Sequence, residues 1–153
     1  MMPRLALFIF LAAAVSADAM AQERQWSLDA GDEDAYLVFG VPETDDVGIS
    51  FWCAMKTGEV NIFVPEADPA MKPGETVPFS VVAGQTVAKL EGRTTANEMS
   101  GTASLEAKVS SRHPLFEALR KADRFKIIVG KQETIYPLID ADVDALLRLC
   151  GKQ

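Results

Sequence analysis

The fold is decided by residues 35–66, which read AYLVFGVPETDDVGISFWCAMKTGEVNIFVPE. Residues 35–41, 47–55 and 59–64 are rich in the branched and aromatic residues that favour β-strands. The turn formers at 42–46 and the tight turn Lys56-Thr57-Gly58 separate them. The stretch therefore predicts three consecutive strands joined as antiparallel hairpins.

The middle strand of this meander has one strongly apolar side. Successive side chains of a strand point to opposite faces, which predicts that Cys53 faces the core and Trp52 faces outward. We expect Trp26, Tyr36 and Phe63 to lie with Trp52 on the outer face. There they would form a binding patch for a protein or a carbohydrate, or be covered by a second layer. The inward positions are Val47, Ile49, Phe51, Cys53 and Met55.

The remaining chain continues the β pattern and ends with helices. Strands are predicted at residues 26–28, 77–82, 85–91, 100–109, 124–129 and 134–138, with a long proline-rich loop at 65–78 and a turn-like segment at 92–99. Pro114 suits the first position of a short helix, and Asp140 could cap a final helix that carries Cys150. We expect a β-rich α+β domain, mostly antiparallel, built as a sandwich or flattened barrel with two short helices in its C-terminal half.

The N-terminus has the parts of a secretory signal. Arg4 precedes the apolar residues 5–15, and Ala19-Met20-Ala21 forms a small-residue cleavage pattern. We expect cleavage after Ala21, so that residues 22–153 form a single globular domain. The apolar run is shorter than the roughly 20 residues that cross a membrane, so no membrane span is expected.

The chain has two cysteines, Cys53 and Cys150. Exported proteins meet oxidising conditions, and both cysteines fall on predicted core faces, which favours one structural disulfide. No C-x-x-C motif is present, and with one histidine the chain lacks an evident zinc ligand set. A redox or metal role is therefore the weaker interpretation.

Acidic residues are concentrated in the first half of the predicted domain. Between Gln22 and Asp68 there are eleven acidic and two basic residues, and the whole chain has a net charge of −7. This balance argues against a nucleic-acid partner. It indicates either a solvated acidic rim or a docking face for a basic partner, and we select Trp52 with Glu43, Asp45 and Asp46 as the possible binding surface. Neither this run of acids nor Asp29, Asp32 and Asp34 fits a calcium-binding loop, so no metal site is predicted.

Catalytic motifs are lacking in the sequence. His113 is the single histidine, and no G-x-S-x-G, S-x-x-K, H-E-x-x-H or glycine-rich phosphate loop occurs. We assign no catalytic residue and no cofactor. The favoured function is an exported binding or interaction module for an envelope protein or a small ligand. The alternatives are a small hydrolase centred on His113 and an inhibitor of a secreted hydrolase.

Several segments resemble small exported proteins of Gram-negative bacteria, most of which have no assigned activity. The likeness rests on the signal sequence, on Trp26, on YLVFGVPETDDVGISFWC at 36–53, and on FEALRKADRFKIIVG, YPL and LLRLCG between 116 and 151. It implies a periplasmic setting and a disulfide-tied, β-rich domain. It carries over no catalytic residue.

Overall fold

The computed structural model describes residues 23–98 and 101–152. The predicted signal sequence and Ser100, the first residue of one predicted strand, lie outside these ranges. None of the helices within them is long and apolar enough to cross a membrane. The elements in chain order are β1 (Gln25–Ala30), β2 (Asp34–Gly40), β3 (Val47–Ala54), β4 (Glu59–Val64), β5 (Thr76–Ala83), β6 (Thr86–Asn97), β7 (Thr102–Ser110), α1 (Pro114–Leu119), β8 (Arg124–Val129), β9 (Gln132–Pro137) and α2 (Val143–Cys150).

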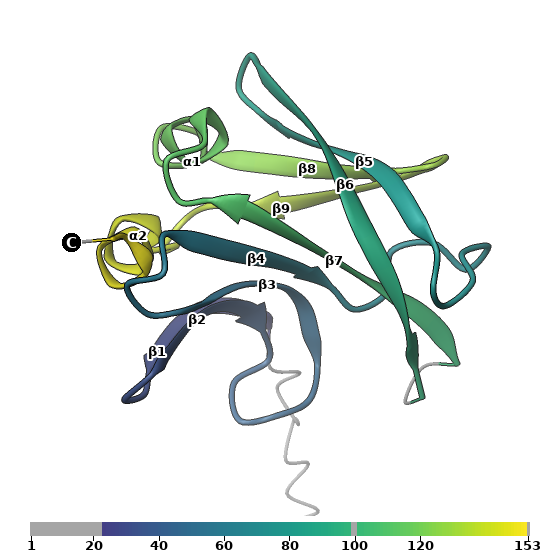
Figure 1. Cartoon of the computed structure of the whole chain (residues 1–153), viewed down its shortest axis with the longest axis horizontal. Helices are drawn as coiled ribbons and strands as arrows, with labels where there is room; N and C mark the ends of the chain where they lie inside the picture. Colours follow the sequence, from purple (N-terminus) through teal and green to yellow (C-terminus); the bar gives the residue numbers. More distant parts are fainter. Residues whose placement is uncertain (1–22, 99–100, 153) are drawn as a thin grey trace, which may run out of the picture.

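The strands form one antiparallel sheet that curls into a half-barrel (Figure 1). Their spatial order is β1-β2-β3-β4-β7-β6-β5-β8-β9. The two helices lie side by side at one end of the curl, at the left of Figure 1. The predicted β-rich α+β fold with two late helices is confirmed, and its form is the barrel-like one, a single curved sheet.

The predicted meander is confirmed as β2, β3 and β4. The hairpin loop at 41–46 places Phe51 opposite Leu37, and Phe51 also pairs with Ile62. Ile49, Phe51 and Cys53 are buried on the inner face. Their position agrees with the period-two pattern, which therefore sets the inside of the curl.

Side chains close the seam between the two end strands. Strand directions alternate across the nine strands, so β1 and β9 run parallel to each other and cannot continue the antiparallel ladder. Instead the Trp26 Nε1–H donates to the Pro137 carbonyl at 2.7 Å, and the Tyr136 hydroxyl donates to the Gly48 carbonyl at 3.1 Å. An aromatic cluster packs beneath, formed by Trp26, Phe39, Phe51, Phe125 and Tyr136.

The prediction that Trp26 lies on the outer face is wrong. Trp26 pairs with Phe39 across β1 and β2 and is only 8% exposed. Its partner faces the interior, and cross-strand partners share a face of the sheet. Burial of the indole against the far end of the sheet decides its orientation.

The turn-like segment expected at 92–99 is also a wrong prediction, because β6 continues to Asn97. At Gly92 an added Cβ would lie 2.6 Å from Cδ1 of Leu105, so glycine here admits the leucine of the neighbouring strand. Thr95 pairs with Ser104, and their hydroxyls are 2.8 Å apart. The small polar residues therefore fit a close strand pairing.

The C-terminal helix is tied to the meander. The Cys53–Cys150 disulfide is present, as the two cysteines predict, and joins β3 to the last residue of α2. The backbone N–H groups of Lys56 and Gly58 donate to the carbonyls of Leu149 and Cys150, at 2.9 and 2.8 Å. The β3–β4 turn thus satisfies carbonyls at the end of α2 that the helix itself leaves unpaired.

The cap of the same helix differs from the expectation. Asp142, and not Asp140, caps α2, since its Oδ1 accepts from the Ala145 N–H at 2.8 Å. Asp140 occupies a turn with φ +64°, a conformation that aspartate tolerates better than most residues.

Candidate functional site

The outer face of the meander carries a row of side chains across neighbouring strands. Register places Tyr36 opposite Trp52, and Trp52 opposite Asn61. Asp29 of β1 is opposite Tyr36, and Lys108 of β7 is opposite Asn61. Cross-strand partners share a face, so all five side chains lie on the side away from the core. The predicted outward position of Trp52 is therefore found in the fold.

Tyr36 and Trp52 form a stacked aromatic pair on this face. Their ring centroids are 5.9 Å apart, and the ring planes differ by 17°. Tyr36 is 39% exposed, and Trp52 is partly exposed. Beside them, buried Asn61 donates through Nδ2 to the Trp52 carbonyl at 3.3 Å. Two large rings thus reach solvent on rigid strands, where their positions are fixed by the sheet.

Carboxylates surround this pair. Asp29 is next to Tyr36 in the row, and Asp34 lies two residues before Tyr36 on the same face of β2. Glu59 begins β4 on the same face as Asn61. Its Oε2 atom forms an ion pair with Nζ of Lys108 at 3.5 Å. Within the described ranges, neither Asp29 nor Asp34 has an ion-pair partner. We name the group Asp29, Asp34, Tyr36, Trp52 and Glu59 the acidic–aromatic face.

The structure does not bring Glu43, Asp45 and Asp46 to Trp52. These three acids lie in the β2–β3 loop, before β3 begins, and Trp52 lies near the other end of that strand. Six residues of extended chain separate Asp46 from Trp52, a distance of about 20 Å. The predicted binding surface therefore divides into two separate regions of the molecule.

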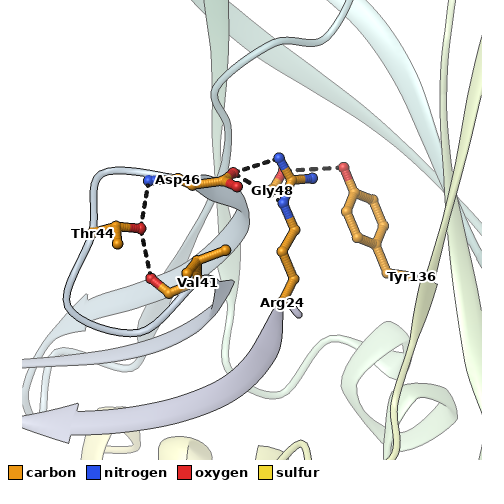
Figure 2. A network of polar contacts seen from close by, with 6 residues as sticks. All are labelled: Arg24, Val41, Thr44, Asp46, Gly48 and Tyr136. Carbon is orange, nitrogen blue, oxygen red and sulfur yellow. Dashed lines mark hydrogen bonds and ion pairs between the residues drawn. The ribbon is translucent and has the colours of Figure 1, made fainter. Parts of the chain in front are cut away.

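One of the loop acids, Asp46, belongs to a local polar network at the seam (Figure 2). The Thr44 hydroxyl donates to the Val41 carbonyl at 2.8 Å and accepts from the Asp46 N–H at 3.1 Å. The Asp46 carboxylate in turn accepts from Nε of Arg24 at 2.9 Å. Asp46 is thus already paired within the chain, which weakens its case as a docking charge.

A polar hollow of about 350 Å³ adjoins this network. Tyr136 lines it and donates its hydroxyl proton to Gly48 (Figure 2). Burial raises the pKa of Tyr136, although Arg24 and a hydrogen bond with Thr134 act in the other direction. A retained phenolic proton suits a hydrogen-bond donor that joins β9 to β3 across the seam, and the hollow is best explained by that structural task. Its other lining residues include Arg24, Asp45, Asp46, Glu66 and Asn97.

His113 has a structural task as well. Its Nδ1 accepts the Leu115 N–H at 3.1 Å and caps α1. A catalytic histidine takes a proton on one ring nitrogen and is oriented by a hydrogen bond at the other. In His113 the Nδ1 atom is already engaged by the backbone and serves neither purpose. Among the described residues, no three His, Cys, Asp or Glu side chains gather in a group suited to a metal ion.

Comparisons of the chain with protein-family models, with curated proteins and with solved structures found no match. The choice between the two regions therefore depends on their own geometry. In the described ranges the acidic–aromatic face has exposed rings and two carboxylates without an ion-pair partner, Asp29 and Asp34, whereas Asp46 at the hollow is paired with Arg24. Sequence reasoning found Trp52 but missed Asp29, Asp34 and Glu59, although the hairpin registers contain the signal that aligns them.

Proposed function

We propose that this chain is an exported, periplasmic interaction module that binds a partner protein through its acidic–aromatic face. The signal-like residues 1–21 support export. The buried Cys53–Cys150 disulfide is compatible with an oxidising compartment. A binding role without catalysis accounts for the chemistry that the outer surface offers.

One observation carries the proposal, the stacked and exposed Tyr36–Trp52 pair. Tyrosine and tryptophan are enriched at the energetically important centres of protein interfaces, because they bury large areas at low entropic cost. Here both rings rise from adjacent strands of a rigid sheet, so they need little reorganisation before binding.

The hydrolase alternative receives less support. It depends on His113, whose Nδ1 is already the cap acceptor of α1. An inhibitor of a secreted hydrolase would be one form of the proposed module, since it too would act by occupying a partner. Turnover of a substrate by the purified chain alone would favour the hydrolase and contradict the proposal.

Export and binding can be tested separately. Export predicts that the periplasmic fraction of producing cells contains a chain that starts at Gln22, measurable by intact mass. For binding, a photo-crosslinking phenylalanine derivative replaces Trp52 in the cells that naturally produce the protein. A control carries it at Ile135, which is 55% exposed on β9 at the far end of the strand order.

We expect one predominant adduct with the same protein in repeated experiments from position 52, and none of it from position 135. Equal adducts from both positions would indicate unspecific labelling and would contradict the proposal. No adduct from position 52 would do the same.

A further inference from the structure

The chemistry of the acidic–aromatic face specifies the kind of partner. We infer that the partner presents arginine side chains, and that a guanidinium group docks on the Tyr36–Trp52 rings beside Asp29 and Asp34. This inference rests on the proposed function and adds the identity of the group that is recognised.

The rings supply the first part of the argument. Aromatic faces carry negative electrostatic potential and attract cations, tryptophan most strongly among the side chains. Tyr36 and Trp52 are stacked, with 5.9 Å between their centroids and 17° between their planes, so each ring turns one face toward the other and offers its remaining exposed surface to a ligand. A planar guanidinium can stack on such a surface, whereas a lysine ammonium cannot.

The carboxylates supply the second part. Asp29 flanks the ring pair across β1 and β2, and Asp34 flanks it along β2. Both lack an ion-pair partner in the described residues, whereas Glu59 is paired with Lys108. A docked guanidinium could stack on the rings and direct its N–H groups to either aspartate, which satisfies both its planar surface and its donors.

Charge complementarity also separates a basic partner from other occupants. The half of the chain that contains this face has eleven acidic and two basic residues between Gln22 and Asp68. An acidic protein or a nucleic acid would be repelled, and a neutral glycan could donate hydrogen bonds to the carboxylates but would form no ion pair with them. The acidic residues would attract a basic protein before contact, and the rings would hold it once it is bound.

The two tryptophans make a direct test possible. Trp26 is buried and its Nε1–H is bonded to the Pro137 carbonyl, whereas Trp52 is on the face. The ¹⁵N-labelled chain is titrated with three synthetic Gly/Ser peptides that contain arginine, lysine or citrulline at the same positions. We expect the arginine peptide to shift the Trp52 indole signal most, the lysine peptide less and the neutral citrulline peptide least. The Trp26 signal should stay in place as an internal reference.

Matched variants locate the charges. Asp29→Asn with Asp34→Asn should weaken binding of the arginine peptide by about two- to fivefold per aspartate. Glu43→Gln with Asp45→Asn removes the same charge about 20 Å away, as judged from the length of β3. This control should change affinity by less than about twofold, since salt screens charges at that distance. Native spectra of each variant confirm folding.

Two results would overturn the inference. One is a citrulline peptide that binds as well as the arginine peptide, because charge would then be irrelevant. The other is an equal loss of affinity in the control variant, which would mean unspecific attraction to an acidic protein. Either result can occur while the photo-reactive residue at position 52 still cross-links to a defined partner, so failure of this inference is distinguishable from failure of the proposed function.

Discussion

Breaking the Cys53–Cys150 disulfide should lower the free energy of unfolding by up to about 4.7 kcal/mol. The bond joins positions 97 residues apart, and closing a loop of about 100 residues restricts the unfolded chain by that amount in the chain-entropy model. For about 130 residues the entropy of unfolding at the melting temperature is roughly 0.27 kcal/mol per kelvin. The corresponding fall in melting temperature is up to about 17 °C.

Three forms of the protein separate the cross-link from the packing of the sulfur atoms. Oxidised and reduced wild type both keep the sulfurs in the core, so their difference measures the cross-link. The Cys53→Ala, Cys150→Ala variant also loses buried sulfur, because both cysteines are fully buried, and it should be the least stable. Urea unfolding followed by tryptophan fluorescence gives the three free energies.

A local readout accompanies the global one. The Lys56 and Gly58 N–H groups donate to carbonyls at the end of α2, where the disulfide anchors the helix. Their hydrogen exchange should accelerate on reduction more than that of β6, which lies away from α2 in the sheet. Reduced and oxidised forms that unfold within about 0.5 kcal/mol of each other would refute the reasoning. So would two reactive thiols in the oxidised, denatured protein.

Three further outcomes are expected. Gly92→Ala should destabilise the protein by about 1–3 kcal/mol in urea unfolding, because the new Cβ would meet Leu105 at 2.6 Å, whereas Gly31→Ala meets its nearest atom at 3.8 Å and should cost less. The folded state raises the pKa of Tyr136 above its ordinary 10.0, so it holds the phenolic proton after the unfolded state has released it. Unfolding free energy should therefore fall as pH rises above about 10, and Tyr136→Phe should reduce that slope. His113→Ala should cost about 0.5–2 kcal/mol, while His113→Asn, which keeps a cap acceptor, should cost less, as measured by thermal unfolding. If His113→Asn lost as much stability as His113→Ala, the role of His113 as a cap would be contradicted.

Local patterns were sufficient to predict the meander. Its alternation and its short turns specify which residues face inward, and Cys53 lies on the predicted side. The pairing of Cys53 with Cys150 needed only the count of cysteines and the expectation of export. The meander depends on the nearest neighbours along the chain, where sequence carries the most information, whereas the disulfide was predictable because the chain offers only two cysteines to pair.

Long-range packing explains the wrong predictions. Trp26 turns inward because its indole reaches the Pro137 carbonyl, 111 residues away in the chain. Gly92 sits inside a strand because Leu105 of β7 fills the space beside it. Neither partner is visible in the residues around the position itself, so propensity favoured an exposed tryptophan and a glycine turn.

The candidate site was predicted only in part, again because its neighbours come from other strands. Trp52 follows from alternation, but its acidic neighbours were sought in the nearest acidic run along the chain, at Glu43, Asp45 and Asp46. In the fold, neighbours are set by cross-strand register, which aligns Asp29 and Asp34 with the rings instead. The length of the β2–β3 loop does not reveal this register, because a bulge at Phe39/Gly40 shifts it by one residue, and the β1–β2 hairpin is what places Asp29 opposite Tyr36.

The way in which the sheet closes also explains why function should be sought outside the curl. Barrels that bind ligands inside need an open lumen, whereas here large side chains fill the interior, among them Phe51, Phe116 and Phe125. Nine alternating strands leave β1 and β9 parallel and unpaired in the sheet, and the side chains of Trp26 and Tyr136 make hydrogen bonds across this seam. The aromatic residues of the seam are thereby committed to stability. Of the rings on β2 and β3, the pair on the outer face, Tyr36 and Trp52, has no comparable task in the core, and that is the physical reason to assign recognition to it.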